Sequence, residues 1–169
     1  MVDFEKDFYA NLGLLSVRFA KMEFKLTVIL GKLIGADEEL IPMLLTENLT
    51  LYRKLELIRK INKVRTHRES LMETLYAQVE DIRIHRNSFI HGVWGDPYEK
   101  DNDVFIECKV IKIKYEESEF PKQRLVKKRW TKSKTTTYRL TFIRTLITKL
   151  DDVIMSQDAL ISELENKQF

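Results

Sequence analysis

The sequence contains little cysteine, histidine, glycine or proline, and it lacks a long hydrophobic run. Because Cys108 is the single cysteine, an internal disulfide is impossible, and one thiol with three scattered histidines does not form a zinc site. The most apolar stretch, residues 26–34, is interrupted by Lys32 and is too short to cross a membrane. The first residues are acidic, unlike the basic start of a signal peptide. We therefore expect a cytoplasmic protein with no metal, cofactor or membrane partner.

The remaining composition is that of a globular protein. Hydrophobic residues make up 44% of the chain and charged residues 33%, with a formal net charge of +3. A chain of 169 residues is long enough to bury a core without disulfides or metals. Since no linker, repeat or low-complexity tract divides the sequence, we predict a single domain over residues 1–169.

Four segments place apolar residues at alternating spacings of three and four, the pattern of an amphipathic helix. These segments cover about residues 8–33, 51–61, 71–90 and 141–164. Gly35 and Gly92 follow the first and third segments and are typical helix terminators. Thr141 is a suitable N-cap for the last helix. The pattern predicts a mainly helical fold.

Between the third and fourth helical segments the sequence changes character. Residues 104–115 are rich in β-branched and aromatic side chains, which favour a strand. Residues 124–130 form a second extended segment, and residues 135–138 a possible third short strand. We predict a β-hairpin insertion at about residues 103–138, before the last helix.

Arg86 stands in the middle of the apolar stripe of the third helical segment, where a leucine is expected. Burying an unpaired guanidinium costs several kcal/mol, so Arg86 needs a carboxylate, a neighbouring subunit or an anionic ligand. Glu23, beside the apolar stripe of the first helix, is the candidate carboxylate. Four more polar residues lie next to Arg86 within an arc of roughly 140°: Glu80, Arg83, Asn87 and His91. This polar edge predicts a functional site or an interface.

The segment Arg86-Asn87-x-x-x-His91, followed by Gly92 and Trp94, resembles the Arg-x4-6-His signature of HEPN-domain proteins. The order of the segments also resembles the up-and-down bundle of four to five helices in that family, with the hairpin as an addition. Many HEPN proteins are metal-independent endoribonucleases that act as dimers, in which the arginine and histidine of two subunits meet. The resemblance implies the same for this chain.

Under this resemblance Arg86, Asn87 and His91 are the catalytic candidates. Cleavage by the RNA 2′-hydroxyl needs a base, an acid and a cation for the phosphorane oxygens. Two copies of His91 across a two-fold axis would supply the base and the acid, and Arg86 would clamp the phosphate. The position of His91 at a helix C-terminus favours its protonated form, which suits an acid. Asn87 would orient the phosphate or the histidine.

The resemblance further suggests a toxin or phage-defence effector with a neutralising partner protein. A second reading of the same residues is a non-catalytic module that binds a nucleotide, RNA or a protein. A third is a purely structural helical dimer, in which Arg86 forms a buried ion pair and His91 caps the helix. Trp94 is expected to anchor the edge of the bundle, and His67 and His85 are expected to be solvated.

Residues 122–139 carry eight lysines and arginines and no acidic residue. Positive charge with interleaved aromatic residues is typical of surfaces that bind single-stranded RNA. The predicted RNA contacts are Lys127, Lys128, Arg129, Trp130 and Lys132. The alternative is an exposed hairpin whose lysines only prevent aggregation of its edges.

Overall fold

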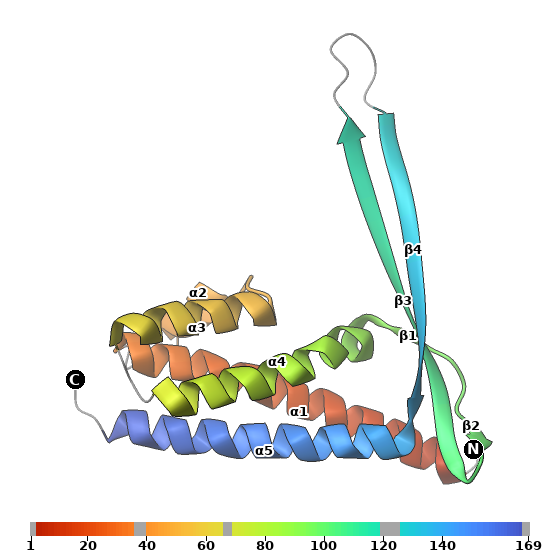
Figure 1. The fold of residues 1–169 in the computed structure, drawn as a ribbon, viewed down its shortest axis with the longest axis horizontal. Helices are drawn as coiled ribbons and strands as arrows, with labels where there is room; N and C mark the ends of the chain where they lie inside the picture. The colour runs from red at the N-terminus through yellow and green to blue at the C-terminus, as the bar shows by residue number, and fades with distance from the viewer. Residues whose placement is uncertain (1–2, 36–39, 66–68, 119–125, 167–169) are drawn as a thin grey trace.

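The computed structural model describes residues 3–35, 40–65, 69–118 and 126–166 (Figure 1). These residues form five helices: α1 (Asp3–Ile34), α2 (Leu40–Thr46), α3 (Leu51–Arg65), α4 (Glu69–His91) and α5 (Leu140–Glu165). They also form four strands: β1 (Val93–Trp94), β2 (Tyr98–Lys100), β3 (Asp103–Ser118) and β4 (Val126–Arg139). The prediction of a mainly helical fold with a β-hairpin before the last helix is confirmed. None of the described helices is both long enough and apolar enough to cross a membrane.

The helices surround one hydrophobic core. Each long helix contributes side chains with almost no exposure, among them Phe19, Ile58, Ile82 and Leu150. α1, α3 and α5 run in one direction, and α4 runs in the opposite direction between them, so that it returns toward the amino-terminal end of α1 (Figure 1). The apolar spacing seen in the sequence therefore corresponds to the buried face of each helix.

α1 and α5 form the most extensive helix pair and run parallel (Figure 1). Ion pairs follow the seam between them at intervals of seven residues in both helices: Arg18 with Asp151, Lys25 with Asp158, and Lys32 with Glu165. A seven-residue repeat keeps side chains on one seam of two packed helices, as in a coiled coil. Gln157, fully buried in α5, donates a hydrogen bond to the carbonyl oxygen of Met22 in α1 at 3.1 Å. These contacts fix the register of the two helices.

The sheet is antiparallel, and β3 is its central strand. β4 pairs along one edge of β3, from Phe105 opposite Arg139 to Ser118 opposite Val126. The short strands β1 and β2 pair with the other edge, near the bundle. Because β4 is continuous to Arg139, the expected separate strand at residues 135–138 is wrong. Arg139 is also the N-cap of α5, so the expected cap at Thr141 is wrong as well.

The hairpin of β3 and β4 extends far beyond the helices as an arm (Figure 1). Among the described strands, β1 and β2 pair with β3 only up to Lys109, so the outer part of the arm has two strands. The 16 residues of β3 correspond to a length of roughly 50 Å at about 3.3 Å per residue. The side chains of residues 112–130 lie outside the described part of the structure.

Gly92 marks the close contact between the end of α4 and β3. Its amide donates to the carbonyl oxygen of Ser88 at 2.9 Å, and the thiol of Cys108 donates to the same oxygen at 3.2 Å. A Cβ atom on residue 92 would overlap both the Cys108 sulfur and the Ser88 carbonyl oxygen. Glycine is therefore required here by space.

We expect Gly92→Ala to lower the free energy of unfolding by about 2 kcal/mol or more, because the backbone of Ser88 cannot move away without disturbing α4. Gly95→Ala is the matched control, since its added methyl meets its nearest neighbour at an ordinary 3.7 Å. Urea denaturation of both variants gives the comparison. Equal stability of the two variants would contradict the close contact at Gly92.

Candidate functional site

Arg86 contacts two of the other predicted site residues, Glu23 and His91. Its Nε donates to Oε1 of Glu23 in α1 at 2.8 Å, and its Nη1 lies 3.4 Å from Nε2 of His91 at the end of α4. The side chains of Arg86 and Glu23 are 23% and 21% exposed, so the pair lies at the edge of the core, reachable by solvent. The expected ion pair with Glu23 is present. The contact between Arg86 and His91 forms within one chain, whereas the sequence suggested that they meet across a dimer.

His91 is the last residue of α4, and its ring adjoins the Arg86 guanidinium. An arginine N–H only donates, so it forms a hydrogen bond with Nε2 only when that nitrogen is unprotonated. Such a hydrogen bond uses the single lone pair of a neutral imidazole, so Nε2 is available to take a proton only when Arg86 turns away from it. His91 is exposed, which leaves its ring accessible to a substrate.

One turn earlier on α4, Arg83 and Glu80 form a second charged pair. Nε of Arg83 lies 2.7 Å from Oε2 of Glu80, and its Nη2 contacts Oε1. This hydrogen bonding lowers the pKa of Glu80. The Arg83 guanidinium also lies over the ring of Tyr52 in α3, 5.5 Å from its centroid. Asn87 is exposed on the same side of α4, toward solvent.

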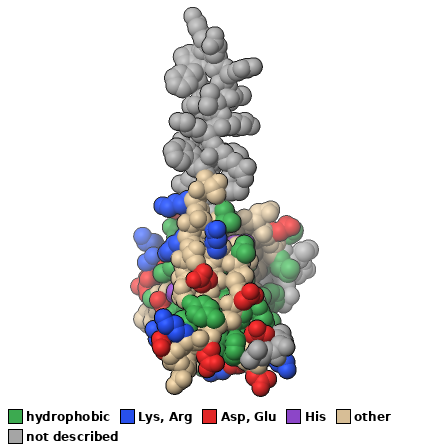
Figure 2. All heavy atoms as spheres, turned by 90° about the vertical axis from the view of Figure 1, so that its right-hand side faces the viewer, with side chains coloured by type: hydrophobic (Ala, Val, Ile, Leu, Met, Phe, Trp, Pro, Cys, Tyr) green, Lys and Arg blue, Asp and Glu red, His purple; other side chains and the backbone are tan. Residues whose placement is uncertain are grey.

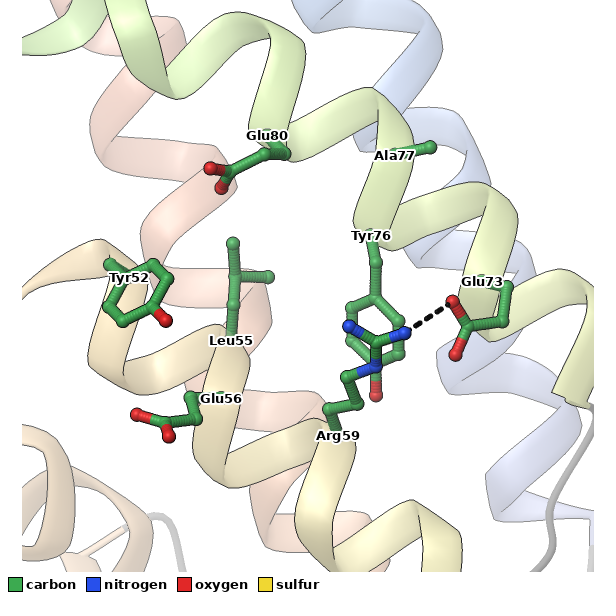
Figure 3. Close-up of a pocket in the computed structure, with 8 residues that line it drawn as sticks. All are labelled: Tyr52, Leu55, Glu56, Arg59, Glu73, Tyr76, Ala77 and Glu80. Atoms are coloured by element: carbon green, nitrogen blue, oxygen red, sulfur yellow. Dashed lines mark hydrogen bonds and ion pairs between the residues drawn. The ribbon is translucent and has the colours of Figure 1, made fainter.

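A shallow pocket of about 360 Å³ continues this face of α4 toward α3 (Figure 3). Arg59 lies over the ring of Tyr76 and is paired with Glu73 at 3.1 Å (Figure 3). Tyr76 is 8% exposed, and its hydroxyl has no hydrogen-bond partner among the described residues. Burial raises the pKa of this hydroxyl. This pocket was not predicted, because its residues come from two helices, and the periodicity of each helix does not determine how the two are rotated against each other.

Aromatic residues join the end of α4 to the base of the sheet. The ring of Trp94 lies 5.2 Å from that of Phe89 and 5.7 Å from that of Tyr138. Trp94 is thus an anchor at the edge of the bundle, as predicted. His85 is half-buried, with its ring 5.1 Å from that of Phe142, and burial lowers its pKa. The expectation that His85 is solvated is therefore wrong, and His67 lies outside the described residues.

The predicted RNA-binding residues belong to β4. Lys132 is exposed, and Lys127, Lys128, Arg129 and Trp130 occupy strand positions whose side chains are not among those described. Near the bundle, Lys and Arg side chains gather around the start of the arm (Figure 2). Exposed residues there include Lys109, Lys132 and Lys134. The motif on α4 and the arm are separate surfaces joined through the sheet.

A scan against protein-family models and searches of curated proteins and of solved structures each find no match to this chain.

Proposed function

We propose that this protein is a metal-independent endoribonuclease of the HEPN type, with Arg86, Asn87 and His91 as its catalytic residues. The observation that supports this proposal is the contact of Arg86 with both Glu23 and His91 on the last turn of α4. A cation and an imidazole that adjoin each other at a solvent-reachable edge match the groups needed for cleavage by a 2′-hydroxyl. The motif also lies at the end of a core helix that precedes the last helix, as the resemblance implies.

Each residue has a distinct role in this proposal. His91, exposed at the end of α4, takes the proton of the 2′-hydroxyl at Nε2 once Arg86 turns from that nitrogen to the phosphate, and His91 of a second copy returns a proton to the leaving 5′-oxygen. Arg86 stabilises the charge on the phosphorane oxygens. Glu23 orients Arg86 and is a positioning residue rather than a catalytic one. Arg83 and Glu80 support the same face of α4, and Asn87 contacts the phosphate.

The test is incubation of the pure protein with a mixed RNA pool, with and without EDTA. We expect cleavage in both cases, with 2′,3′-cyclic phosphate ends, because arginine and histidine perform the roles that a metal performs elsewhere. An Arg86→Ala/His91→Ala variant is the control for contaminating nucleases. Loss of cleavage on chelation, or equal cleavage by the double variant, would contradict the proposal.

We further propose that the arm binds RNA through its phosphates. Changing Lys127, Lys128, Arg129 and Lys132 to serine should weaken binding of unrelated RNA sequences alike. The slope of log K against log salt should fall by about 3, since each lost contact with a single strand contributes about 0.7. Fluorescence anisotropy at several salt concentrations measures this slope. An unchanged slope would assign these residues to protection of the hairpin edges.

A non-catalytic binding module is the second candidate, and one observation favours it. The carboxylate of Glu23 already neutralises Arg86, so the ion pair also serves to join α1 to α4. Such a module would bind RNA or a protein partner at the exposed face of α4 without breaking a bond. A role as a toxin or defence effector, with a neutralising partner protein, is a proposal that follows only if RNA is cleaved.

A further inference from the structure

The shallow pocket between α3 and α4 has a hydrophobic floor and a charged rim (Figure 3). Leu55 and Tyr76 are its most deeply buried lining residues, at 6% and 8% exposed. Four more accessible residues with charged side chains form the rim: Glu56, Arg59, Glu73 and Glu80. An apolar pocket with a few polar groups at its edge is the usual form of a small-molecule site, and a volume of about 360 Å³ is sufficient for one.

The hydroxyl of Tyr76 is a buried polar group without a hydrogen-bond partner among the described residues. Buried hydroxyl groups are nearly always hydrogen-bonded, so an unpaired one needs a reason. Because Tyr76 lines the pocket, its hydroxyl can donate a hydrogen bond to a group that enters. The pocket is therefore incomplete without a ligand that carries an acceptor.

Arg59 shows what kind of group fits this part of the pocket. Its planar guanidinium lies over the Tyr76 ring, 5.7 Å from the centroid, and donates to Oε2 of Glu73 at 3.1 Å (Figure 3). The ring face and the carboxylate thus bind a flat group that carries N–H donors on one edge. The side chains of Arg59 and Glu73 are 64% and 57% exposed, so their ion pair is weak and readily exchanged.

The neighbouring Arg83 packs in the same way but is held more firmly. Its guanidinium lies over the ring of Tyr52 and donates to both oxygens of Glu80. Its side chain is 29% exposed, against 64% for Arg59. The exchangeable position in the pocket is therefore the one that Arg59 occupies.

We propose that the guanine base of an RNA substrate replaces the Arg59 guanidinium in this pocket. Guanine is flat, and it alone among the four RNA bases carries two adjacent N–H donors, N1–H and N2–H, on its base-pairing edge. The base stacks on Tyr76 and donates both hydrogen bonds to the Glu73 carboxylate, as an arginine fork does. The Tyr76 hydroxyl, at the edge of the ring, then donates to the ribose. The released Arg59 pairs with a phosphate.

The phosphate favours a nucleotide over an arginine side chain from a partner protein. An incoming arginine would repeat the contacts that Arg59 already makes and would place a second cation beside it, so the exchange would bring no advantage. A nucleotide brings a larger ring for stacking and an anion for the displaced guanidinium.

The pocket lies on the face of α4 that leads to the motif. Glu73, Glu80 and Asn87 are seven residues apart, so they follow one side of the helix. Tyr76 precedes Arg86 by ten residues, which is about 15 Å along the helix axis. Four or five stacked nucleotides span this distance at about 3.4 Å each. The inference rests on the proposed function for the source of the base, and it predicts cleavage within about five nucleotides of a guanine.

The first test is isothermal titration calorimetry of the full chain with 5′-GMP and 5′-AMP, which contain no phosphodiester bond to cleave. GMP should bind at least about tenfold more tightly, because adenine presents an acceptor beside its amino group. Glu73→Gln should weaken GMP binding about tenfold, since an amide oxygen replaces only one of the two carboxylate acceptors. Glu99→Gln is the matched control: Glu99 is exposed on β2, at the opposite end of the molecule from α3 (Figure 1). It should bind GMP as wild type does.

The second test examines the exchange itself. Tyr76→Phe keeps the ring and removes the unpartnered hydroxyl, so it should weaken GMP binding about fivefold without loss of stability in urea. Arg59→Ala removes the group that the base displaces, so guanosine, which has no phosphate, should bind about threefold more tightly than to wild type. GMP should lose its advantage over guanosine in this variant, because the phosphate has lost its arginine.

The third test distinguishes RNA from a free nucleotide as the source of the base. Two pentanucleotides carry guanine or adenine at the centre of a uracil background, and 2′-deoxyribose prevents their cleavage. The guanine pentanucleotide should bind about fivefold more tightly than the adenine one, and more tightly than GMP, because it offers more phosphates. Weaker binding than GMP would overturn the assignment to RNA and leave a site for a free nucleotide.

Other results would overturn the base site altogether. They are equal affinities for GMP and AMP, GMP binding that Glu73→Gln leaves unchanged, and the absence of GMP binding at about 1 mM, which would leave the pocket to a side chain of a partner protein. A failure of the proposed function has a different signature. GMP binding without cleavage of any RNA would contradict the nuclease alone, whereas cleavage without a preference for guanine would contradict only this inference.

Discussion

We expect His91→Ala to lower the rate of RNA cleavage by at least about a hundredfold, since removal of a general base or acid typically costs that much. The fold should be unaffected, because His91 is exposed at the last position of α4. The affinity of the variant for RNA should also be nearly unchanged, because the proposed phosphate contacts are on the arm and His91 is not one of them. Single-turnover cleavage rates, thermal unfolding and anisotropy measure the three quantities.

Ile84→Ala is the matched control for this variant. Ile84 is exposed on α4 and does not belong to the motif. It should retain wild-type cleavage. Equal rates for His91→Ala and Ile84→Ala would show that His91 only caps the helix, and would favour the non-catalytic module.

The second large effect concerns Arg86, which should influence both activity and stability. Arg86→Ala should abolish cleavage and lower the free energy of unfolding by about 2 kcal/mol, because it leaves the Glu23 carboxylate half-buried and unpaired. Adding Glu23→Gln should recover about half of that stability without recovering cleavage. Urea denaturation of wild type, Arg86→Ala, Glu23→Gln and the double variant gives a double-mutant cycle for the pair.

The pair of Arg83 with Glu80 provides the comparison. This pair joins neighbouring turns of one helix and is more exposed, so Arg83→Ala should change stability by no more than about 0.5 kcal/mol. If Arg86→Ala were as stable as wild type, the partly buried Glu23 carboxylate would not need the Arg86 guanidinium as its partner. Recovery of cleavage in the double variant would exclude Arg86 from the chemistry.

Helical periodicity predicted the central contact of the site. A fixed step of 100° per residue identifies Arg86 as core-facing, and the cost of an unpaired charge then requires a carboxylate such as Glu23. The ends of α1 and α4 were also predictable, since Gly35 and Gly92 follow them. These inferences need only local geometry and the energetics of burial.

Other features depend on tertiary contacts that the sequence pattern does not contain. β4 continues past Ser133 because it pairs with β3, although its own residues are polar. α2 is too short to show a period, and its Pro42 is tolerated because it lies in the first turn. The packing of Arg83 on Tyr52 follows from how α3 and α4 are rotated against each other.

The parallel seam between α1 and α5 sets an order of events during synthesis. Lys25 and Asp158 are 133 positions apart in the chain, so their contact cannot form until most of the protein has left the ribosome. A nascent chain that has reached His91 still lacks α5, and with it part of the core that holds α1 and α4 together. The Glu23–Arg86 pair therefore stands on a complete core only after the last helix has emerged.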